Sequence, residues 1–358
     1  MIHISVHGTT KCDTGCANCS FNSCPKGDDL PPKVIKKLKQ SVGSYRGKVE
    51  VAFTGSGEPL MWQDLPEAIS ILKPLPRVSF GLVTSGCKNK QDDRFTVLSE
   101  AFKVEDLIQV FHSFNLYSPS FPERLAFTLP FILEKSRYAY AGIKLTSGFS
   151  PQDDQGNEAR IHVKEVTEAF ERALEQAVGK CSRLEGFPIG NNFYSKRIAE
   201  ILRRNRIEPS FKRWLAYKSF LFGAIYRPYD LAFRDRTIQT VGAPVFLQGR
   251  FKRFATPDLA DYAYGEGFYC DGYGDFISLS TKGEFIYCPY RKDFPPLILG
   301  EVGGSLKEAV LAKRRLTYEW LNLPRLELSG QGKLSDPCDN CVTHAWEVFN
   351  ERGYDYLQ

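Results

Sequence analysis

The sequence lacks long hydrophobic runs, since no apolar stretch approaches the roughly 18 residues that a transmembrane helix requires. Its first residues, Met1–Ser5, contain neither the basic nor the apolar segment of a secretory signal peptide. A strong charge bias is also absent: 47 basic and 42 acidic residues leave a net charge of +5 over 358 residues. A nucleic-acid-binding surface usually needs a concentrated basic patch. We therefore expect a cytoplasmic protein that binds neither a membrane nor nucleic acid.

Cysteine, by contrast, is abundant. Disulfides are rare in the reducing cytoplasm, so metal or cluster binding is the better explanation for so many thiols. Eight of the ten cysteines fall within the first 24 or the last 90 residues, at positions 12, 16, 19, 24, 270, 288, 338 and 341; the others are Cys87 and Cys181. The thiols thus bracket the chain and predict one site near each end.

Buried-strand patterns alternate with helical patterns over the first 190 residues. The expected strands are Ile2–His7, Val49–Thr54, Val78–Thr84, Leu107–Ser113, Tyr138–Thr146 and, more weakly, Ser182–Phe187. Helical spacing of apolar residues marks Pro31–Ser41, Pro66–Leu72, Pro122–Lys135 and Val163–Val178. This alternation predicts an α/β fold with a parallel sheet. Six units favour a partial (βα)6 TIM-like barrel, although periodicity alone does not separate it from a doubly wound sheet.

The pattern changes in the last third of the chain. Prolines punctuate the sequence from Pro228 onwards, and Phe276–Leu279 and Glu284–Tyr287 flank a Thr281-Lys282-Gly283 turn that predicts a hairpin. Leu306–Leu316 has the pattern of a helix. We expect a barrel domain over residues 1–245 and a small α+β domain over residues 246–358.

Three cysteines form a C-x3-C-x2-C pattern directly after the first expected strand: Cys12, Cys16 and Cys19. Three thiolates on one loop can hold three irons of a [4Fe–4S] cube and leave the fourth iron open. A structural zinc ion would need a fourth ligand, for which Cys24 is available. The loop would lie at the carboxyl end of a strand, where barrel enzymes place their active sites.

Together with a Gly-rich segment one βα unit later, this loop resembles the radical S-adenosylmethionine (SAM) superfamily. The resemblance implies that the open iron chelates SAM and that an electron from the cluster produces a 5′-deoxyadenosyl radical, which abstracts a substrate hydrogen atom. The segment after the second strand would hold the methionine ammonium through its backbone and carboxylate; it comprises Gly55, Ser56, Gly57, Glu58 and Pro59. Glycines permit close backbone approach, and a carboxylate complements an ammonium.

Other SAM contacts follow from the same resemblance. Ser85 and Ser113, at the ends of the third and fourth strands, would contact ribose and carboxylate, or act only as strand-end hydrogen-bonding residues. The family usually has an aromatic residue before the third cysteine, where this chain has Asn18; Phe21 is a candidate substitute near the adenine.

A second set of thiols has the pattern C-x12-G-x4-C followed by C-x2-C: Cys270, Cys288, Cys338 and Cys341. Spacing alone fits zinc and a fully ligated [4Fe–4S] cluster equally well. The pattern resembles the SPASM domain in its shortened twitch form, which implies an auxiliary [4Fe–4S] cluster for electron transfer; a purely structural role is the alternative. Arg291, between the second and third ligands, is a candidate substrate contact.

The chemical outcome stays open at this point. Cys87 or Cys181 could return a hydrogen atom to the substrate, as in the family's epimerases, or the auxiliary cluster could oxidise the radical, as in its dehydrogenases. We favour dehydrogenation of a sugar-like or other small metabolite over modification of a short peptide, because the expected barrel begins at residue 2 and leaves no room for a leader-binding module. Flavodoxin or ferredoxin is the expected reductant. A non-catalytic zinc-binding module is the rival class.

Overall fold

The computed structural model describes residues 2–16, 19, 21, 23–114, 120–135, 140–146, 276–289 and 295–321, together with short pieces at 172–173, 175–176, 179, 182–183, 231–233, 236–243, 327–328 and 333–334. Within these residues, no helix has the length and apolar character needed to cross a membrane.

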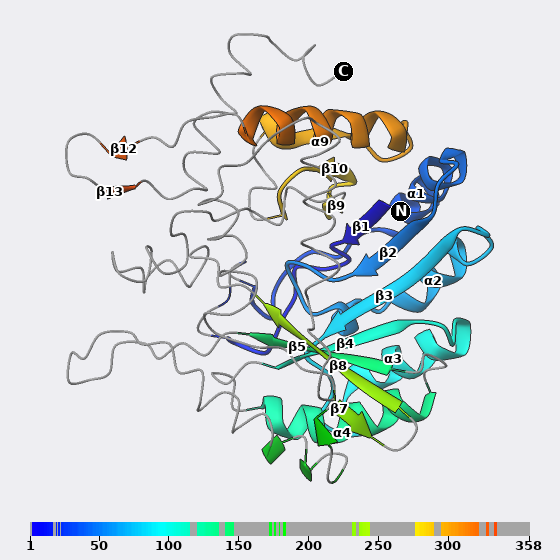
Figure 1. Cartoon of the computed structure of the whole chain (residues 1–358). Helices are drawn as coiled ribbons and strands as arrows, with labels where there is room; N and C mark the ends of the chain where they lie inside the picture. Colours follow the sequence, from blue (N-terminus) through cyan, green and yellow to red (C-terminus); the bar gives the residue numbers. More distant parts are fainter. Residues whose placement is uncertain are drawn as a thin grey trace.

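Strands and helices alternate through the first half of the chain (Figure 1), in the order β1 (Ile2–Val6), α1 (Pro32–Ser44), β2 (Val49–Phe53), α2 (Leu65–Leu72), β3 (Val78–Thr84), α3 (Asp93–Val104), β4 (Gln109–Phe114), α4 (Phe121–Lys135) and β5 (Tyr140–Thr146). A short 3-10 helix, Pro59–Met61, lies between β2 and α2. The first five expected strands are therefore confirmed, as are the helices expected over 31–41, 66–72 and 122–135. The helix expected over Val163–Val178 lies largely outside the described residues.

Local sequence explains why these elements form. Proline at position 32 suits the first turn of α1, and the apolar residues that follow it at helical spacing, among them Val34 and Leu38, are buried. Helix α3 was not among the expected helices, although Val97, Leu98 and Ala101 are buried at helical spacing and Arg94 shares their face. Its start is nevertheless marked by Asp92, whose carboxylate accepts a hydrogen bond from the Arg94 backbone N–H at 3.1 Å.

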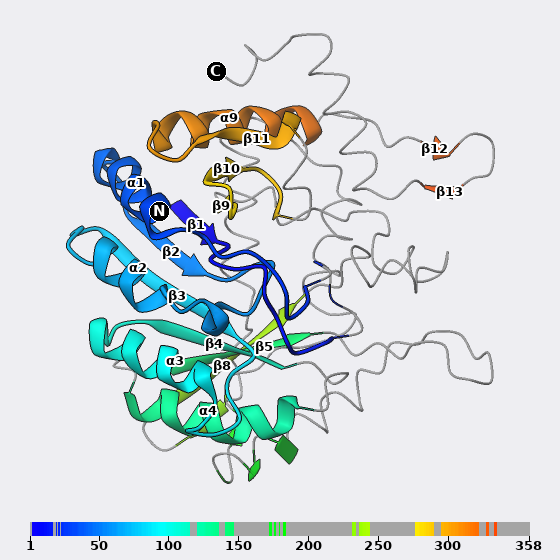
Figure 2. The same cartoon turned by 180° about the vertical axis from the view of Figure 1, so that it is seen from behind.

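The barrel strands are parallel and lie side by side in the order β1-β2-β3-β4-β5-β8. Helices α1 to α4 lie in a row along one side of this sheet in both views (Figures 1 and 2). A doubly wound sheet would reverse its strand order and carry helices on both faces. The uninterrupted order and the one-sided helices therefore identify a partial TIM-like barrel, as expected.

The sixth parallel strand is not the one expected from the sequence. It is β8 (Arg236–Ala243), which pairs with β5 from Tyr140–Thr237 to Thr146–Ala243. The described part of the expected strand, Ser182–Arg183, forms β6, which pairs antiparallel with β7 (Leu231–Phe233) and does not lie beside β5. The interpretation of Ser182–Phe187 as the sixth barrel strand was therefore wrong. Pro228 and Pro244 made the intervening stretch look like loop, but they bracket β8 without interrupting it.

The other edge of the sheet is extended by the C-terminal part of the chain. Strand β9 (Phe276–Leu279) pairs in parallel with β1, and the His7 N–H donates to the Leu279 carbonyl at 3.0 Å. Strands β10 (Glu284–Ile286) and β11 (Ile298–Glu301) continue antiparallel, and helix α9 (Leu306–Leu321) follows. The expected hairpin is confirmed, and the expected helix extends beyond its sequence pattern, from Leu316 to Leu321.

This edge is firmly joined to the barrel. The Ser41 hydroxyl of α1 donates to the Gly304 carbonyl at 2.8 Å and accepts from the Gly303 N–H at 2.9 Å. Buried residues of β9, β10 and α9 belong to the same hydrophobic core as β1 and β2. The division at residue 245 stays a prediction, but the described core is continuous across it.

Candidate functional site

The loop after β1 leaves the sheet at the carboxyl ends of the parallel strands and returns alongside itself. The Thr10 N–H donates to the Asp28 carbonyl at 2.9 Å, and the Cys12 N–H donates to the Cys24 carbonyl at 2.8 Å. Lys11 and Asp29 form an ion pair at 2.6 Å between the two arms. The outgoing arm therefore holds Cys12 at a defined position before the segment that carries the other two thiols.

The three thiols of this loop, Cys12, Cys16 and Cys19, are all partly buried. Among the described side chains, no three Cys, His, Asp or Glu residues converge closely enough to hold a single metal ion. Cys24, the candidate fourth zinc ligand, is exposed, and its Sγ lies 2.8 Å from the Lys26 carbonyl oxygen. Three partly buried thiols on one loop suit the three cysteine-bound irons of a [4Fe–4S] cube.

Burial raises the pKa of the Cys12 thiol above its usual value. Hydrogen bonds with Thr14 lower this pKa, and the nearby Glu58 charge raises it. The thiol is therefore protonated near neutral pH in the metal-free protein, so that metal binding releases a proton.

The turn that follows β2 is pressed against the cysteine loop. A Cβ atom at Gly57 would lie 2.5 Å from the Thr9 carbonyl oxygen and 2.6 Å from that of Lys11, so only glycine fits. The next residue, Glu58, donates its backbone N–H to the Lys11 carbonyl at 2.8 Å. Two segments that were expected to share a site, one βα unit apart, are thus in direct backbone contact.

Gly55 and Ser56 attach the same turn to the end of β1. Gly55 has a φ of 120°, and a Cβ there would lie 2.5 Å from the His7 ring. The Ser56 N–H donates to His7 Nδ1 at 3.2 Å, and the Ser23 hydroxyl donates to the Ser56 carbonyl. Because Cys19 Sγ lies 3.7 Å from Ser23 Oγ, the turn also reaches the third thiol.

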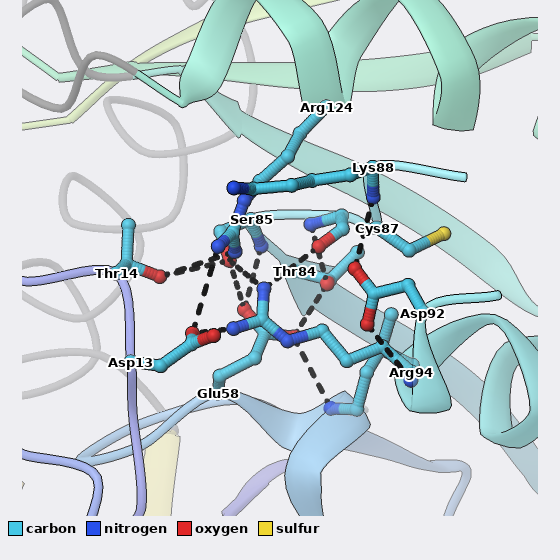
Figure 3. A network of polar contacts seen from close by, with 12 residues as sticks. Asp13, Thr14, Glu58, Thr84, Ser85, Cys87, Lys88, Asp92, Arg94 and Arg124 are labelled. Atoms are coloured by element: carbon cyan, nitrogen blue, oxygen red, sulfur yellow. Dashed lines mark hydrogen bonds and ion pairs between the residues drawn. The ribbon is translucent and has the colours of Figure 1, made fainter.

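Glu58 is 3% exposed, and its carboxylate accepts four hydrogen bonds from the protein itself (Figure 3). One oxygen accepts from the Leu60 N–H at 3.1 Å and from the Thr84 hydroxyl. The other accepts from the Ser85 N–H at 2.7 Å and the Ser85 hydroxyl at 2.6 Å. These four donors match the capacity of a carboxylate. Glu58 therefore fastens the turn after β2 to the end of β3, and its expected contact with an ammonium stays a prediction.

Two arginines that the sequence patterns did not single out meet at the same place (Figure 3). Arg94 of α3 and Arg124 of α4 are both 3% exposed. Their Nη1 atoms lie 3.5 and 3.1 Å from Ser85 Oγ, and their Nη2 atoms both approach Asp13 Oδ1, with 3.6 Å for Arg124. Thr14 Oγ1 lies 3.2 Å from Ser85 Oγ. Two buried guanidinium groups and the carboxylates of Asp13 and Glu58 therefore meet around Ser85, beside the cysteine loop.

The remaining candidates are distributed differently. Ser113 is partly buried at the end of β4 and takes no part in the network of Figure 3. Cys87 is fully buried, its Sγ lies 3.5 Å from Thr128 Oγ1 of α4, and burial raises its pKa to about 11. Cys181, Arg291, Cys270, Cys338, Cys341 and Asn18 lie outside the described residues.

Cys288 is buried two residues beyond the end of β10. Strand β10 runs antiparallel to β9, so the chain that continues beyond β10 moves towards Phe276, the start of β9. Phe276 pairs with His3, near the start of β1. Cys288 thus lies towards the amino end of β1, whereas the cysteine loop leaves the carboxyl end.

His112 of β4 gives a prediction for the pH dependence of stability. It is fully buried beside Gly86 and Phe121, and burial lowers its pKa from 6.5 to about 4. Between these values the unfolded chain binds a proton that the folded chain does not, so stability falls as pH decreases through this window. The loss by pH 4 is on the order of 3 kcal/mol. Urea unfolding of reduced, metal-free protein at about pH 6.5 and pH 4.5 should show a smaller decrease for His112→Gln than for the unsubstituted protein. Equal decreases would contradict the assignment.

A comparison with protein families agrees with this geometry, since the model of the radical SAM superfamily matches residues 6–128. No curated protein that was compared matches this sequence. Among solved structures, the chain is similar to BtrN in complex with AdoMet and 2-DOIA, with a TM-score of 0.45 and 9% identity over 90% of this chain and 87% of that chain. It is also similar to a histidine-tagged anSMEcpe with bound AdoMet, with a TM-score of 0.45 and 12% identity over 99% and 97% of the two chains. A third similar structure is native anSMEcpe with bound AdoMet and the Cp18Cys peptide, with a TM-score of 0.46 and 12% identity over 99% and 98%.

The matched residues contain the cysteine loop, the turn after β2 and both buried arginines. Residues 6–128 therefore match a radical SAM domain, and the match covers this part of the chain.

Proposed function

We propose that this protein is a radical SAM oxidoreductase that removes a hydrogen atom from a sugar-like or other small metabolite. The observation that supports it most directly is the backbone contact of Gly57 with Thr9 and Lys11, which holds the SAM-binding turn of the family against the cysteine loop. When bound to Cys12, Cys16 and Cys19, a [4Fe–4S] cluster supplies the electron that cleaves SAM to methionine and a 5′-deoxyadenosyl radical.

The described residues would divide the binding of SAM among them. Since four protein donors already surround the Glu58 carboxylate, we assign the methionine ammonium to the backbone of residues 55–57, which Glu58 holds in place. Arg94 and Arg124 supply the cationic groups that a carboxylate requires, and Ser85 lies between them. Three strand ends and two helices would thus act on one small molecule.

The test is the behaviour of anaerobically prepared full-length protein. We expect brown protein with about eight irons if both proposed clusters are present, and formation of 5′-deoxyadenosine when dithionite and SAM are added. Cys288→Ala should retain the front cluster, with about four irons, and should still cleave SAM. Colourless protein that contains one zinc ion would instead identify the zinc-binding module.

Burial of Cys87 favours oxidation over return of a hydrogen atom. Its thiol is protonated, as a hydrogen-atom donor must be, but it is fully buried and bonded to Thr128 on the helical side of the sheet. Cys181 keeps epimerisation as the alternative outcome. We propose that the four C-terminal cysteines bind an auxiliary cluster of the SPASM or twitch type, which accepts the second electron.

Turnover in D2O separates the two outcomes. A product that is oxidised by two electrons and contains no solvent deuterium supports dehydrogenation, whereas one incorporated deuterium supports a thiol donor. Flavodoxin or ferredoxin remains the proposed reductant, a short peptide the alternative substrate, and the cytoplasm the proposed compartment.

A further inference from the structure

The segment between the first two thiols has few described contacts with the rest of the barrel. Gly15 adopts a left-handed conformation with a φ of 67°, and a Cβ there would meet no atom within 4 Å. A hydrogen bond from the Cys19 N–H to the Cys16 carbonyl, at 3.2 Å, stays within the loop and does not attach it to the barrel. The side chains of Asp13 and Thr14 contact helices α3 and α4 and the end of β3.

Of the two residues, Asp13 makes the stronger contact, because its carboxylate faces two buried arginines. Its side chain is 44% exposed, whereas the Arg94 and Arg124 side chains that it meets are 4% and 3% exposed. A buried guanidinium is costly unless it is paired with a carboxylate. Among the described contacts, Asp13 is the carboxylate that both arginines approach directly, since Glu58 reaches them only through Ser85.

Both arginines are held by other partners. Arg94 Nη1 donates to the Gly86 carbonyl at 3.0 Å, next to its contact with Ser85. Arg124 Nη1 lies 3.1 Å from Ser85 Oγ, next to the end of β3. The guanidinium groups are thus fixed relative to the ends of β3 and of helices α3 and α4. Asp13, which pairs with both arginines, is therefore held in place as well, and it directly follows Cys12 in the sequence.

We propose that Asp13 is a positioning residue that clamps the cysteine loop to helices α3 and α4 through Arg94 and Arg124, and so keeps the thiols at the spacing that retains the cluster. The inference rests on the proposed function, because it presumes that the loop binds iron. It assigns a role to a side chain that is neither a ligand of iron nor a contact of the substrate.

Iron retention tests the clamp without measuring catalysis. Full-length protein with reconstituted clusters is mixed anaerobically with a ferrous chelator, and the loss of cluster absorbance is followed with time. Cys288→Ala serves as the background, so that the front cluster alone is observed. We expect Asp13→Asn to lose its cluster about tenfold faster, the factor that corresponds to about 1.4 kcal/mol.

Asp28→Asn is the matched control. It makes the same chemical change in the returning arm of the same loop, where the structure describes hydrogen bonds to the Asp28 backbone and none to its carboxylate. Its rate of cluster loss should equal that of the background protein. Arg94→Gln should also accelerate the loss, by no more than Asp13→Asn does, because it leaves Arg124 beside Asp13. The double variant should be no faster than Asp13→Asn, because the contact between Arg94 and Asp13 is already lost in that single variant. Asp13→Glu should restore part of the retention.

The failures of the two proposals are distinguishable. Background protein that binds no iron contradicts the proposed function itself. Background protein that binds iron, with Asp13→Asn releasing it at the same rate, contradicts the clamp. Rates that add in the double variant would show that Asp13 and Arg94 act separately, which also overturns the proposal. If Asp13→Asn does not fold, Arg124→Lys, which keeps the charge but loses the planar fork, should still show faster release.

Discussion

Replacing Cys16 by alanine is expected to reduce 5′-deoxyadenosine formation to the level of a protein-free control. Cys16 is the middle thiol of the loop, and two thiolates cannot hold three irons of a cube. The iron content should fall from about eight to about four if the auxiliary cluster is present. Anaerobic iron analysis and chromatography of the SAM cleavage products provide the measurement.

Cys24→Ala is the control for this variant. Cys24 lies on the returning arm of the same loop and is exposed, and its Sγ contacts the Lys26 carbonyl rather than the other thiols. We expect its iron content and SAM cleavage to match those of the unsubstituted protein. If Cys24→Ala lost the front cluster while Cys16→Ala kept it, the assignment of the ligands would be wrong.

Gly57→Ala should have the largest effect among substitutions that remove no ligand. The added Cβ would lie 2.5 and 2.6 Å from two carbonyl oxygens, and backbone atoms cannot rotate away as a side chain can. Overpacking of this kind costs about 3 kcal/mol or more. The turn must also separate from the cysteine loop, so SAM cleavage should be lost together with stability. Urea unfolding of the metal-free protein measures the first effect, and product analysis the second.

Gly43→Ala provides a comparison with the same chemical change. Gly43 lies near the end of α1, where a Cβ would be 3.6 Å from Leu75 Cδ2, an ordinary contact. Alanine is the better helix former, so this variant should be unchanged or more stable by about 0.5 kcal/mol. A Gly57→Ala variant as stable as Gly43→Ala would show that the two segments are not pressed together.

Sequence patterns predicted those parts of the site that lie on adjacent βα units. Cys12 and Glu58 follow strands with clear buried patterns, and consecutive parallel strands end at the same edge of a sheet. Their proximity was therefore expected, and the contact of the Glu58 N–H with the Lys11 carbonyl is its detailed form.

Arg94, Arg124 and Asp13 could not be recognised in the same way. Charged residues in helices and loops are usually exposed, and nothing in the local sequence distinguishes a buried arginine from a surface one. Their burial depends on how α3 and α4 lie over the ends of β3 and β4. Proline at the start of a helix can be recognised from neighbouring residues alone. The pairing of two buried arginines with one loop carboxylate cannot, because it depends on the tertiary structure.

The same limit applies to the sheet. The strand pattern of Phe276–Leu279 was visible, but its partner was not, because pairing across such a long stretch of chain leaves no trace in periodicity. For β8 the failure was different. Prolines lie on either side of this stretch, and its sequence, RTIQTVGA, does not alternate between polar and apolar residues as a half-buried strand usually does.

The pairing of β9 with β1 also affects how the chain is made. Strand β1 is synthesised well before the strand that covers its outer edge, which ends at Leu279. At a synthesis rate of about 5–20 residues per second, that edge waits roughly 15–50 seconds for its partner. An uncovered strand edge invites pairing with other chains. During synthesis there is therefore an interval in which β1, the strand that precedes the cysteine loop, is paired with β2 alone.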